Sequence, residues 1–158
     1  MKFVADGMLG KLSRWLRMMG HDVKSSTAFT ADELLDMAKK QRRVLLTRDF
    51  ELYQRGTSKG IEAFYAEGET EAERLAELSK RFGLALEINL EKSRCPNCNG
   101  KLRRVAKEKV VGKVEENTFK HYDEFWRCPR CGQVYWQGAH WEGIRATLQE
   151  AEEKLKLL

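Results

Sequence analysis

The chain has 158 residues, of which 42% are hydrophobic and 34% are charged. This length allows one domain of ordinary size together with a small second one. No apolar stretch is as long as a membrane span, and the segment Met1–Asp6 lacks the apolar core of a secretory signal. The composition therefore excludes a protein with membrane-spanning helices, and we expect a cytoplasmic location.

The positive charge is concentrated in the second part of the chain. The formal net charge is +5, with 16 Lys and Arg against 15 Asp and Glu before Ser93, and 13 against 9 after it. Seven cations and a single acid lie between Arg94 and Lys113. Arg103 and Arg104 belong to this group. Such a patch favours a polyanion such as nucleic acid, although a solvated, charged hairpin has the same composition.

Two short apolar segments lead to aspartates. Val44–Leu46 is followed three residues later by Asp49, and Phe3–Ala5 is followed directly by Asp6. Short aliphatic runs bounded by polar residues predict strands that are buried on both faces of a parallel sheet. Ligands of such sheets gather beyond the carboxyl ends of the strands. We therefore expect Asp6 and Asp49 to meet at one edge and to hold a metal ion.

The spacing of apolar residues between Met8 and Met19 predicts an amphipathic helix after the first strand. Its other side carries Lys11, Arg14 and Arg17, which can either steer a phosphate backbone toward the acids or be plain surface residues. Asp6 precedes the first turn of this helix. Capping the free N–H groups there is an alternative to metal binding.

A second helix is predicted from the capping box of Thr30 and Glu33 to a point near Gln41. Asp32 lies in its first turn. This carboxylate either complements the positive end of the helix or serves as a third acid of the site.

The remaining elements complete a small α/β layer. Further strands are predicted at His21–Val23 and Ile61–Ala66, and a further helix from Thr70 to Gly83. Strands that alternate with helices predict an α/β fold with a mainly parallel sheet. The segment after Asp49 is predicted to be a polar connection, and residues 84–90 an edge strand or an extended link.

The composition changes at residues 91–93, so we place a domain boundary there, with one domain at 1–92 and another at 93–158. Strands of a small β-unit are predicted at 102–105, 110–114 and 133–136. Helical spacing from Gly138 onward predicts a C-terminal helix, which can pack on either domain.

Two Cys-Pro-x-Cys knuckles, each followed by a glycine, are the most specific signal in the chain. They contain Cys95, Cys98, Cys128 and Cys131. Four thiolates at this spacing surround one Zn²⁺ and leave no open position, so we expect a structural zinc. Two disulfides are the alternative, but nothing indicates an oxidising compartment. An iron site of the same geometry also fits the sequence.

The aspartates predict a second, catalytic metal. Asp6, Asp32 and Asp49 supply hard oxygen ligands that suit Mg²⁺ or Mn²⁺. An ion held in this way binds a phosphodiester and lowers the pKa of an attacking water. No Gly-x-Ser-x-Gly elbow and no phosphate loop occurs in the sequence as a competing catalytic motif.

Taken together, these motifs resemble the Mut7-C RNase family, in which a PIN-like nuclease domain is fused to a C-terminal zinc ribbon. The resemblance is carried by the following segments: Phe3–Leu12, Trp15–Arg17, Gly20–Val23, Leu45–Asp49, the two knuckles and Tyr135–Trp141. It implies a three-layer, PIN-like α/β domain, a small β zinc ribbon and a divalent-metal-dependent ribonuclease activity.

By this resemblance, Asp6 and Asp49 match the family's strand-end acids, and Asp32 matches an acid that opens the second helix. Asp22 is a further candidate. PIN domains commonly use a fourth acid after a later strand, for which Glu67 is the candidate here.

We thus expect a ribonuclease with a structural Zn²⁺ and a catalytic Mg²⁺ or Mn²⁺. Its substrate contacts are predicted from cations on the first helix, beside Asp49 and on the ribbon. These are Lys11, Arg14, Arg17, Arg48, Arg103 and Arg104. Arg48 can instead pair with a carboxylate. The alternative function is a non-catalytic module that binds RNA or protein through the zinc-stabilised ribbon.

Overall fold

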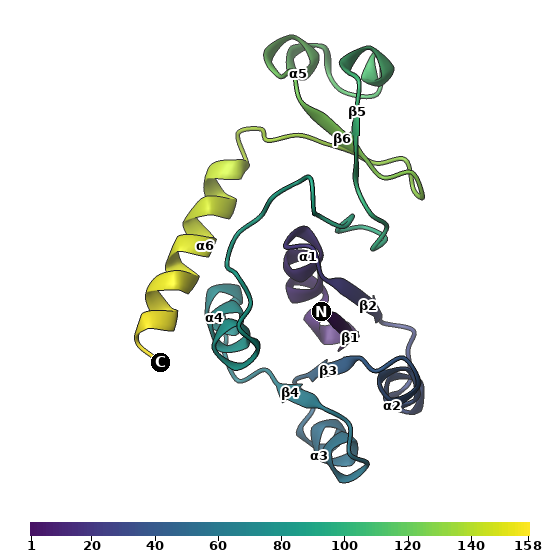
Figure 1. Ribbon diagram of the computed structural model, residues 1–158, viewed down its shortest axis with the longest axis vertical. Helices are drawn as coiled ribbons and strands as arrows, with labels where there is room; N and C mark the ends of the chain where they lie inside the picture. The colour runs from purple at the N-terminus through teal and green to yellow at the C-terminus, as the bar shows by residue number, and fades with distance from the viewer.

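The computed structural model describes all 158 residues and has a parallel four-stranded sheet at its centre (Figure 1). The strands lie in the order β2-β1-β3-β4. Their bounds are Lys2–Asp6 (β1), Asp22–Ser26 (β2), Val44–Thr47 (β3) and Ala63–Tyr65 (β4). This order puts β1 and β3 side by side in the middle, so the ends of the two strands that lead to Asp6 and Asp49 are neighbours.

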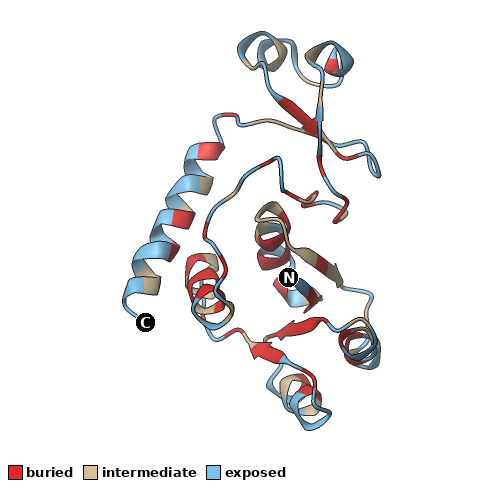
Figure 2. Cartoon of the chain, in the orientation of Figure 1, coloured by how far each residue is buried: buried red, intermediate tan, exposed pale blue.

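Helices cover both faces of the sheet, as expected for a three-layer α/β domain. They are α1 (Gly10–Met18) and α4 (Glu71–Phe82) on one face, and α2 (Ala31–Lys40) and α3 (Phe50–Ser58) on the other. Side chains of β1 alternate accordingly, since Phe3 and Ala5 pack in the first layer and Val4 in the second. Figure 2 shows that β3 is buried along its whole length. The predicted fold class is confirmed.

Helix α3 was not predicted, because its sequence is polar. Only Leu52 and Gly56 of its residues are buried. The helix begins at Asp49, whose side chain accepts hydrogen bonds from the backbone N–H groups of Glu51 and Leu52. The expectation of an irregular polar connection after β3 was therefore wrong, and N-capping is the local signal that marks this helix.

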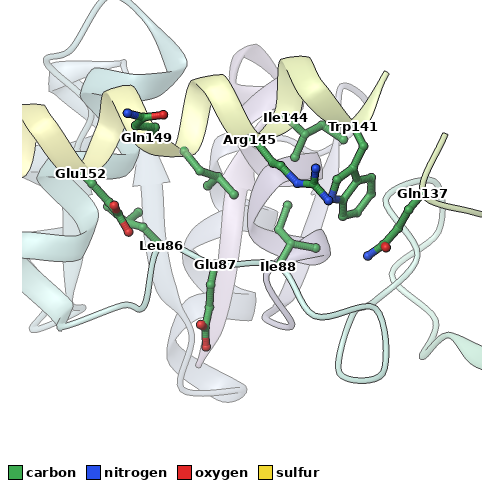
Figure 3. A pocket seen from close by; sticks show the side chains of 10 residues that line it. Leu86, Glu87, Ile88, Gln137, Trp141, Ile144, Arg145, Gln149 and Glu152 are labelled. Atoms are coloured by element: carbon green, nitrogen blue, oxygen red, sulfur yellow. The ribbon is translucent and has the colours of Figure 1, made fainter. Parts of the chain in front are cut away.

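The C-terminal helix α6 (Trp141–Lys156) connects the two parts of the molecule. Leu148 and Ala151 join the core of the α/β layer, whereas Trp141 belongs to the core of the ribbon. The helix lies beside α4 (Figure 1), and residues 84–90 form an irregular link rather than a strand. Between this link and α6 lies a groove of about 520 Å³ (Figure 3). No helix of the protein combines the length and apolar character needed to cross a membrane.

The ribbon is a three-stranded antiparallel sheet in the order β5-β6-β7. Its strands are β5 (Arg103–Val105), β6 (Phe125–Arg127) and β7 (Val134–Tyr135). The prediction of a strand at 110–114 was wrong. The 3₁₀ helix η2 (Lys107–Val110) and the short helix α5 (Glu116–His121) occupy the insertion between β5 and β6. Val110 is fully buried beside Phe125, and Gly112 turns the chain with a φ of +76°.

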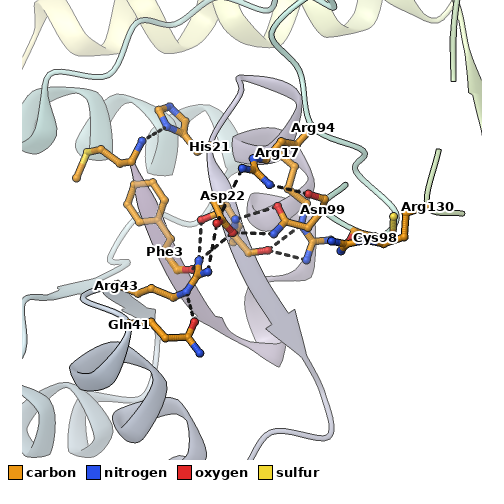
Figure 4. A network of polar contacts seen from close by, with 12 residues as sticks. Phe3, Arg17, His21, Asp22, Gln41, Arg43, Arg94, Cys98, Asn99 and Arg130 are labelled. Carbon is orange, nitrogen blue, oxygen red and sulfur yellow. Dashed lines mark hydrogen bonds and ion pairs between the residues drawn. The ribbon is translucent and has the colours of Figure 1, made fainter. Parts of the chain in front are cut away.

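Polar contacts hold the first knuckle of the ribbon against the sheet (Figure 4). Asn99 accepts a hydrogen bond from the backbone of Val23 at 3.0 Å and donates one to Asp22 Oδ1 at 2.7 Å. Arg17, which is buried in α1, donates to Val23 O and to Pro96 O. The ribbon is thus fixed to β2 by hydrogen bonds that involve both main chain and side chains.

Candidate active site and metal centre

The hydroxyl of Thr47 joins the two strand-end aspartates. Thr47 is fully buried at the end of β3, and its Oγ1 donates to Asp6 Oδ2 at 3.1 Å. The same Oγ1 accepts a hydrogen bond from the backbone N–H of Asp49 at 2.9 Å. Asp6 and Asp49 therefore share one buried hydroxyl at the carboxyl edge of the sheet.

The pairing of the strands explains why these residues meet. Ala5 pairs with Leu46, so the next residues along the chain, Asp6 and Thr47, lie beside each other. Across the next ladder Thr47 pairs with Tyr65. Side chains in register on neighbouring parallel strands point to the same face, about 4.8 Å apart. The edge thus presents a carboxylate, a hydroxyl and a phenol in one row.

Both aspartates also cap helices, as the alternative interpretation of Asp6 expected. Asp6 Oδ1 accepts from the N–H of Met8 at 3.0 Å in the short 3₁₀ helix η1 (Gly7–Leu9). Asp49 uses Oδ1 for α3, while its Oδ2 has no hydrogen-bond partner. Capping leaves carboxylate lone pairs at the edge, so it does not exclude a ligand role.

Asp32 lies in the first turn of α2, which starts near the same edge. Its side chain is 87% exposed and forms an ion pair with Arg55 of α3 at 2.7 Å. Asp6, Asp32 and Asp49 are not among the groups of side chains close enough together to hold a metal ion. Their common binding of one ion stays a prediction.

The two further acids lie in different places. Asp22 is the first residue of β2, whereas Ser26, four residues later, is the residue that pairs with Asp6. Asp22 therefore lies about 13 Å along the strand from the edge that carries Asp6. Its carboxylate is held by Arg43 and Asn99, so it belongs to the contact with the ribbon. Glu67 follows β4 and lies near Glu77 of α4. Burial of Glu77 raises the pKa of its carboxyl, and the negative charge of Glu67 raises it further.

The predicted cations of the α/β layer fall into two groups. Lys11 and Arg14 are exposed on α1 and have no ion-pair partner. Arg17 is buried and donates to the main-chain carbonyls of Val23 in β2 and Pro96 in the first knuckle. Arg48 donates to the carbonyls of Ala66 and Gly68, at 3.0 and 2.7 Å, and so fixes the loop after β4. Of these four side chains, Lys11 and Arg14 are therefore the ones whose N–H groups are free to bind a phosphate.

Arg103 and Arg104 of the ribbon have different surroundings. Arg104 pairs with Glu124 at 2.8 Å and with Glu91 at 3.5 Å. Arg103 lies directly opposite Arg127 on the antiparallel strand β6 and has no carboxylate partner. Like charges in cross-strand register repel each other, so this pair favours a bound anion.

The four cysteines form a compact cluster that could hold a metal ion. Their ligand atoms all lie within 4.8 Å of one another, with contacts of 3.7 Å from Cys95 to Cys131 and 3.4 Å from Cys98 to Cys128. Sulfurs around a tetrahedral zinc, bound at about 2.3 Å, are roughly 3.8 Å apart. All four cysteines are free thiols and not disulfides. The donor set therefore fits one zinc ion.

The glycines of the knuckles are required by this packing. A Cβ on Gly100 would lie 2.9 Å from Cys128 Sγ, and Gly132 adopts a φ of +81°. The backbone N–H of Gln133 lowers the pKa of the Cys131 thiol to about 7. Main-chain N–H groups thus stabilise thiolate at the second knuckle, as metal binding requires.

Sequence reasoning did not identify the aromatic side chains beside the acids. Phe50 follows Asp49 directly and is 53% exposed. Its ring lies 5.9 Å from the ring of Tyr53 and 5.5 Å from that of Tyr65. In the sequence, the signal for this group is an aromatic residue, Phe50, directly after a strand-end aspartate. Tyr65 is brought beside Phe50 only by the pairing of β3 with β4.

Comparison with known proteins identifies one family. A family model described as Mut7-C RNAse domain matches residues 1–148 of the chain. No curated protein and no solved structure matches it.

Proposed function

Since the chain belongs to the Mut7-C RNAse domain family, we propose that it hydrolyses RNA phosphodiester bonds in a divalent-metal-dependent reaction. The observation that carries this proposal is the shared hydroxyl of Thr47 between Asp6 and Asp49. It binds the carboxylate of Asp6 and the main-chain N–H of Asp49, and so holds both residues at the edge of the sheet where ligands of parallel α/β folds bind.

The residues at this edge suit a hard cation. Mg²⁺ is commonly bound by only one or two carboxylates, with water and substrate phosphate completing its shell. Asp6 and Asp49 would hold the ion, which when bound lowers the pKa of water and stabilises charge on phosphate oxygens. Thr47 keeps the carboxylate of Asp6 and the main chain of Asp49 in place, and Lys11 and Arg14 attract the phosphate backbone along α1. Asp32 is the proposed third acid, released from Arg55 when substrate and metal bind.

The test is cleavage of a panel of labelled RNAs by the wild type, Asp6→Asn and Asp49→Asn, with Mn²⁺, with Mg²⁺ and with chelator. We expect cleavage only with metal, and a loss of about 100-fold or more in each variant. Asn accepts the same capping hydrogen bonds, so both variants should stay folded. Asp36→Asn is the matched control, because Asp36 is an exposed acid of α2 whose partner is Lys40.

Equal activity of the wild type and both variants would contradict the proposal. RNA binding that persists in chelator, without cleavage under any metal, would instead favour the alternative of a non-catalytic RNA-binding module. This alternative is supported by Arg103 and Arg127 of the ribbon, which lie opposite each other without a carboxylate partner.

The ribbon is proposed to supply affinity for RNA through Arg103. Arg103→Ala should weaken binding of all RNA sequences and reduce the slope of log K against log salt by about 0.7, the value for one contact to a single strand. Arg104→Ala is the control, because Glu91 and Glu124 already neutralise this side chain. A salt titration of the dissociation constant measures both. Equal slopes for the two variants would show that Arg103 makes no phosphate contact.

A further inference from the structure

Phe50 is an exposed aromatic side chain at the position where the candidate active site opens to solvent. With 53% of its surface exposed, its ring is not explained by packing of the core, which α3 enters through Leu52. Two partly buried rings support it from behind. Tyr53 stacks at an interplanar angle of 28°, and Tyr65 contacts it edge-on at 78°.

The supporting rings fix the orientation of this platform. The Tyr53 and Tyr65 rings are 6.1 Å apart, and Tyr65 is held in the sheet by its pairing with Thr47. Phe50 is also the first residue of α3, directly after the cap at Asp49. The platform, defined as Phe50, Tyr53 and Tyr65, is therefore attached to α3, the helix that Asp49 caps, and to β4, the strand that pairs with β3.

The distance from the acids to the platform suits one nucleotide. Tyr65 lies one strand from Thr47 and two strands from Asp6, about 5 and 10 Å at the usual strand spacing. A base is separated from its own phosphate by a single sugar. A nucleotide whose phosphate lies at Asp6 and Asp49 can thus place its base over Phe50.

We infer that Phe50 stacks on the base of a nucleotide adjoining the phosphate that is cleaved, with Tyr65 and Tyr53 holding its ring in place. This inference rests on the proposed nuclease function and names its substrate class: RNA that is single-stranded at the cleavage position. A base in a duplex is already stacked and paired, so it cannot lie on the platform. Stacking is tolerant of base identity because every base has a π-face, so the site selects strandedness rather than sequence.

The experiment measures binding of short, labelled, single-stranded RNAs by fluorescence anisotropy. The oligonucleotides carry one abasic residue at each position in turn, and all proteins carry Asp6→Asn to prevent turnover. Phe50→Ala is compared with Phe50→Trp, which keeps a stacking ring. Leu157→Ala is the control, because it trims an apolar side chain that is 87% exposed at the end of α6, outside both the ribbon and the edge that carries the acids.

We expect Phe50→Ala to weaken binding of intact RNA by about fivefold or more, the effect of losing one stacked base. For the parent protein, which carries only Asp6→Asn, an abasic residue at one position should weaken binding by the same factor. In Phe50→Ala this abasic residue should weaken binding no further. Phe50→Trp should restore the affinity, and Leu157→Ala should not change it. Duplex RNA should bind the parent and Phe50→Ala equally.

Unchanged affinity in Phe50→Ala, or abasic penalties that add to the effect of this variant, would overturn the inference. Failure of the nuclease proposal gives a different result. In that case Phe50 still governs binding of single strands, but protein with intact Asp6 cleaves nothing under any metal. Cleavage with no dependence of binding on Phe50 would leave the nuclease proposal standing and remove only the platform.

Discussion

Removal of zinc is expected to unfold the ribbon, residues 94–136, while the four-stranded sheet stays folded. The main core of the ribbon consists of 6 buried residues, two of which are the proposed zinc ligands Cys95 and Cys128. Structural zinc contributes about 10 kcal/mol or more to the folding of small modules of this kind. The sheet, by contrast, has 17 buried residues on one face and 8 on the other, and none of them is a cysteine.

Hydrogen exchange after treatment with a zinc chelator measures this outcome. Amides of β6 should lose protection, whereas amides of β3 should keep it. The first turn of α6 should also open, because Trp141 packs in the ribbon core, while the turns that contain Leu148 and Ala151 stay attached to α4. Cys98→Ser should reproduce the pattern without chelator. Protection of β6 that survives in protein shown by analysis to be zinc-free would contradict the prediction.

The parts of the fold that were predictable have strong local signals. The capping box of Thr30 and Glu33 predicted α2, and both of its reciprocal hydrogen bonds are present. The aliphatic run at Val44–Leu46 is buried throughout, as a strand covered on both faces requires. The cysteine spacing predicted that the four thiols lie together, and they do, in an arrangement that could hold one zinc ion.

The parts that were not predictable depend on contacts between distant segments. Arg17 is spaced like a surface cation of α1, and only the docking of the first knuckle turns it into a buried donor to Val23 and Pro96. Asp49 was interpreted as a ligand, which obscured its second role as the cap of α3. Thr47 carries no motif of its own. Its importance follows from the pairing of β1 with β3, which the sequence alone does not specify.

Loss of the buried ion pair between Arg43 and Asp22 should destabilise the protein strongly. Arg43 is 6% exposed and donates to both carboxylate oxygens, at 2.9 and 3.2 Å, as well as to the carbonyl of Phe3. Arg43→Ala leaves a largely buried carboxylate with fewer partners, so we expect a loss of about 3–5 kcal/mol in the free energy of unfolding. Lys40→Ala, which breaks the exposed pair with Asp36, should cost less than about 0.5 kcal/mol. Urea denaturation measures both values.

The same pair predicts how stability depends on pH. Burial disfavours the charged form of Asp22, but hydrogen bonds from Arg43 and Asn99 outweigh it and lower the pKa to about 2 from an ordinary value of 3.8. A carboxyl whose pKa is depressed in the folded state stabilises the protein above its unfolded pKa and loses this contribution as the pH falls through the folded value. Wild type should therefore lose about 2 kcal/mol more than Asp22→Asn between pH 5 and pH 2. Parallel stability profiles for the two proteins across this range would contradict the assignment, because Asp22 would then have the same pKa folded and unfolded.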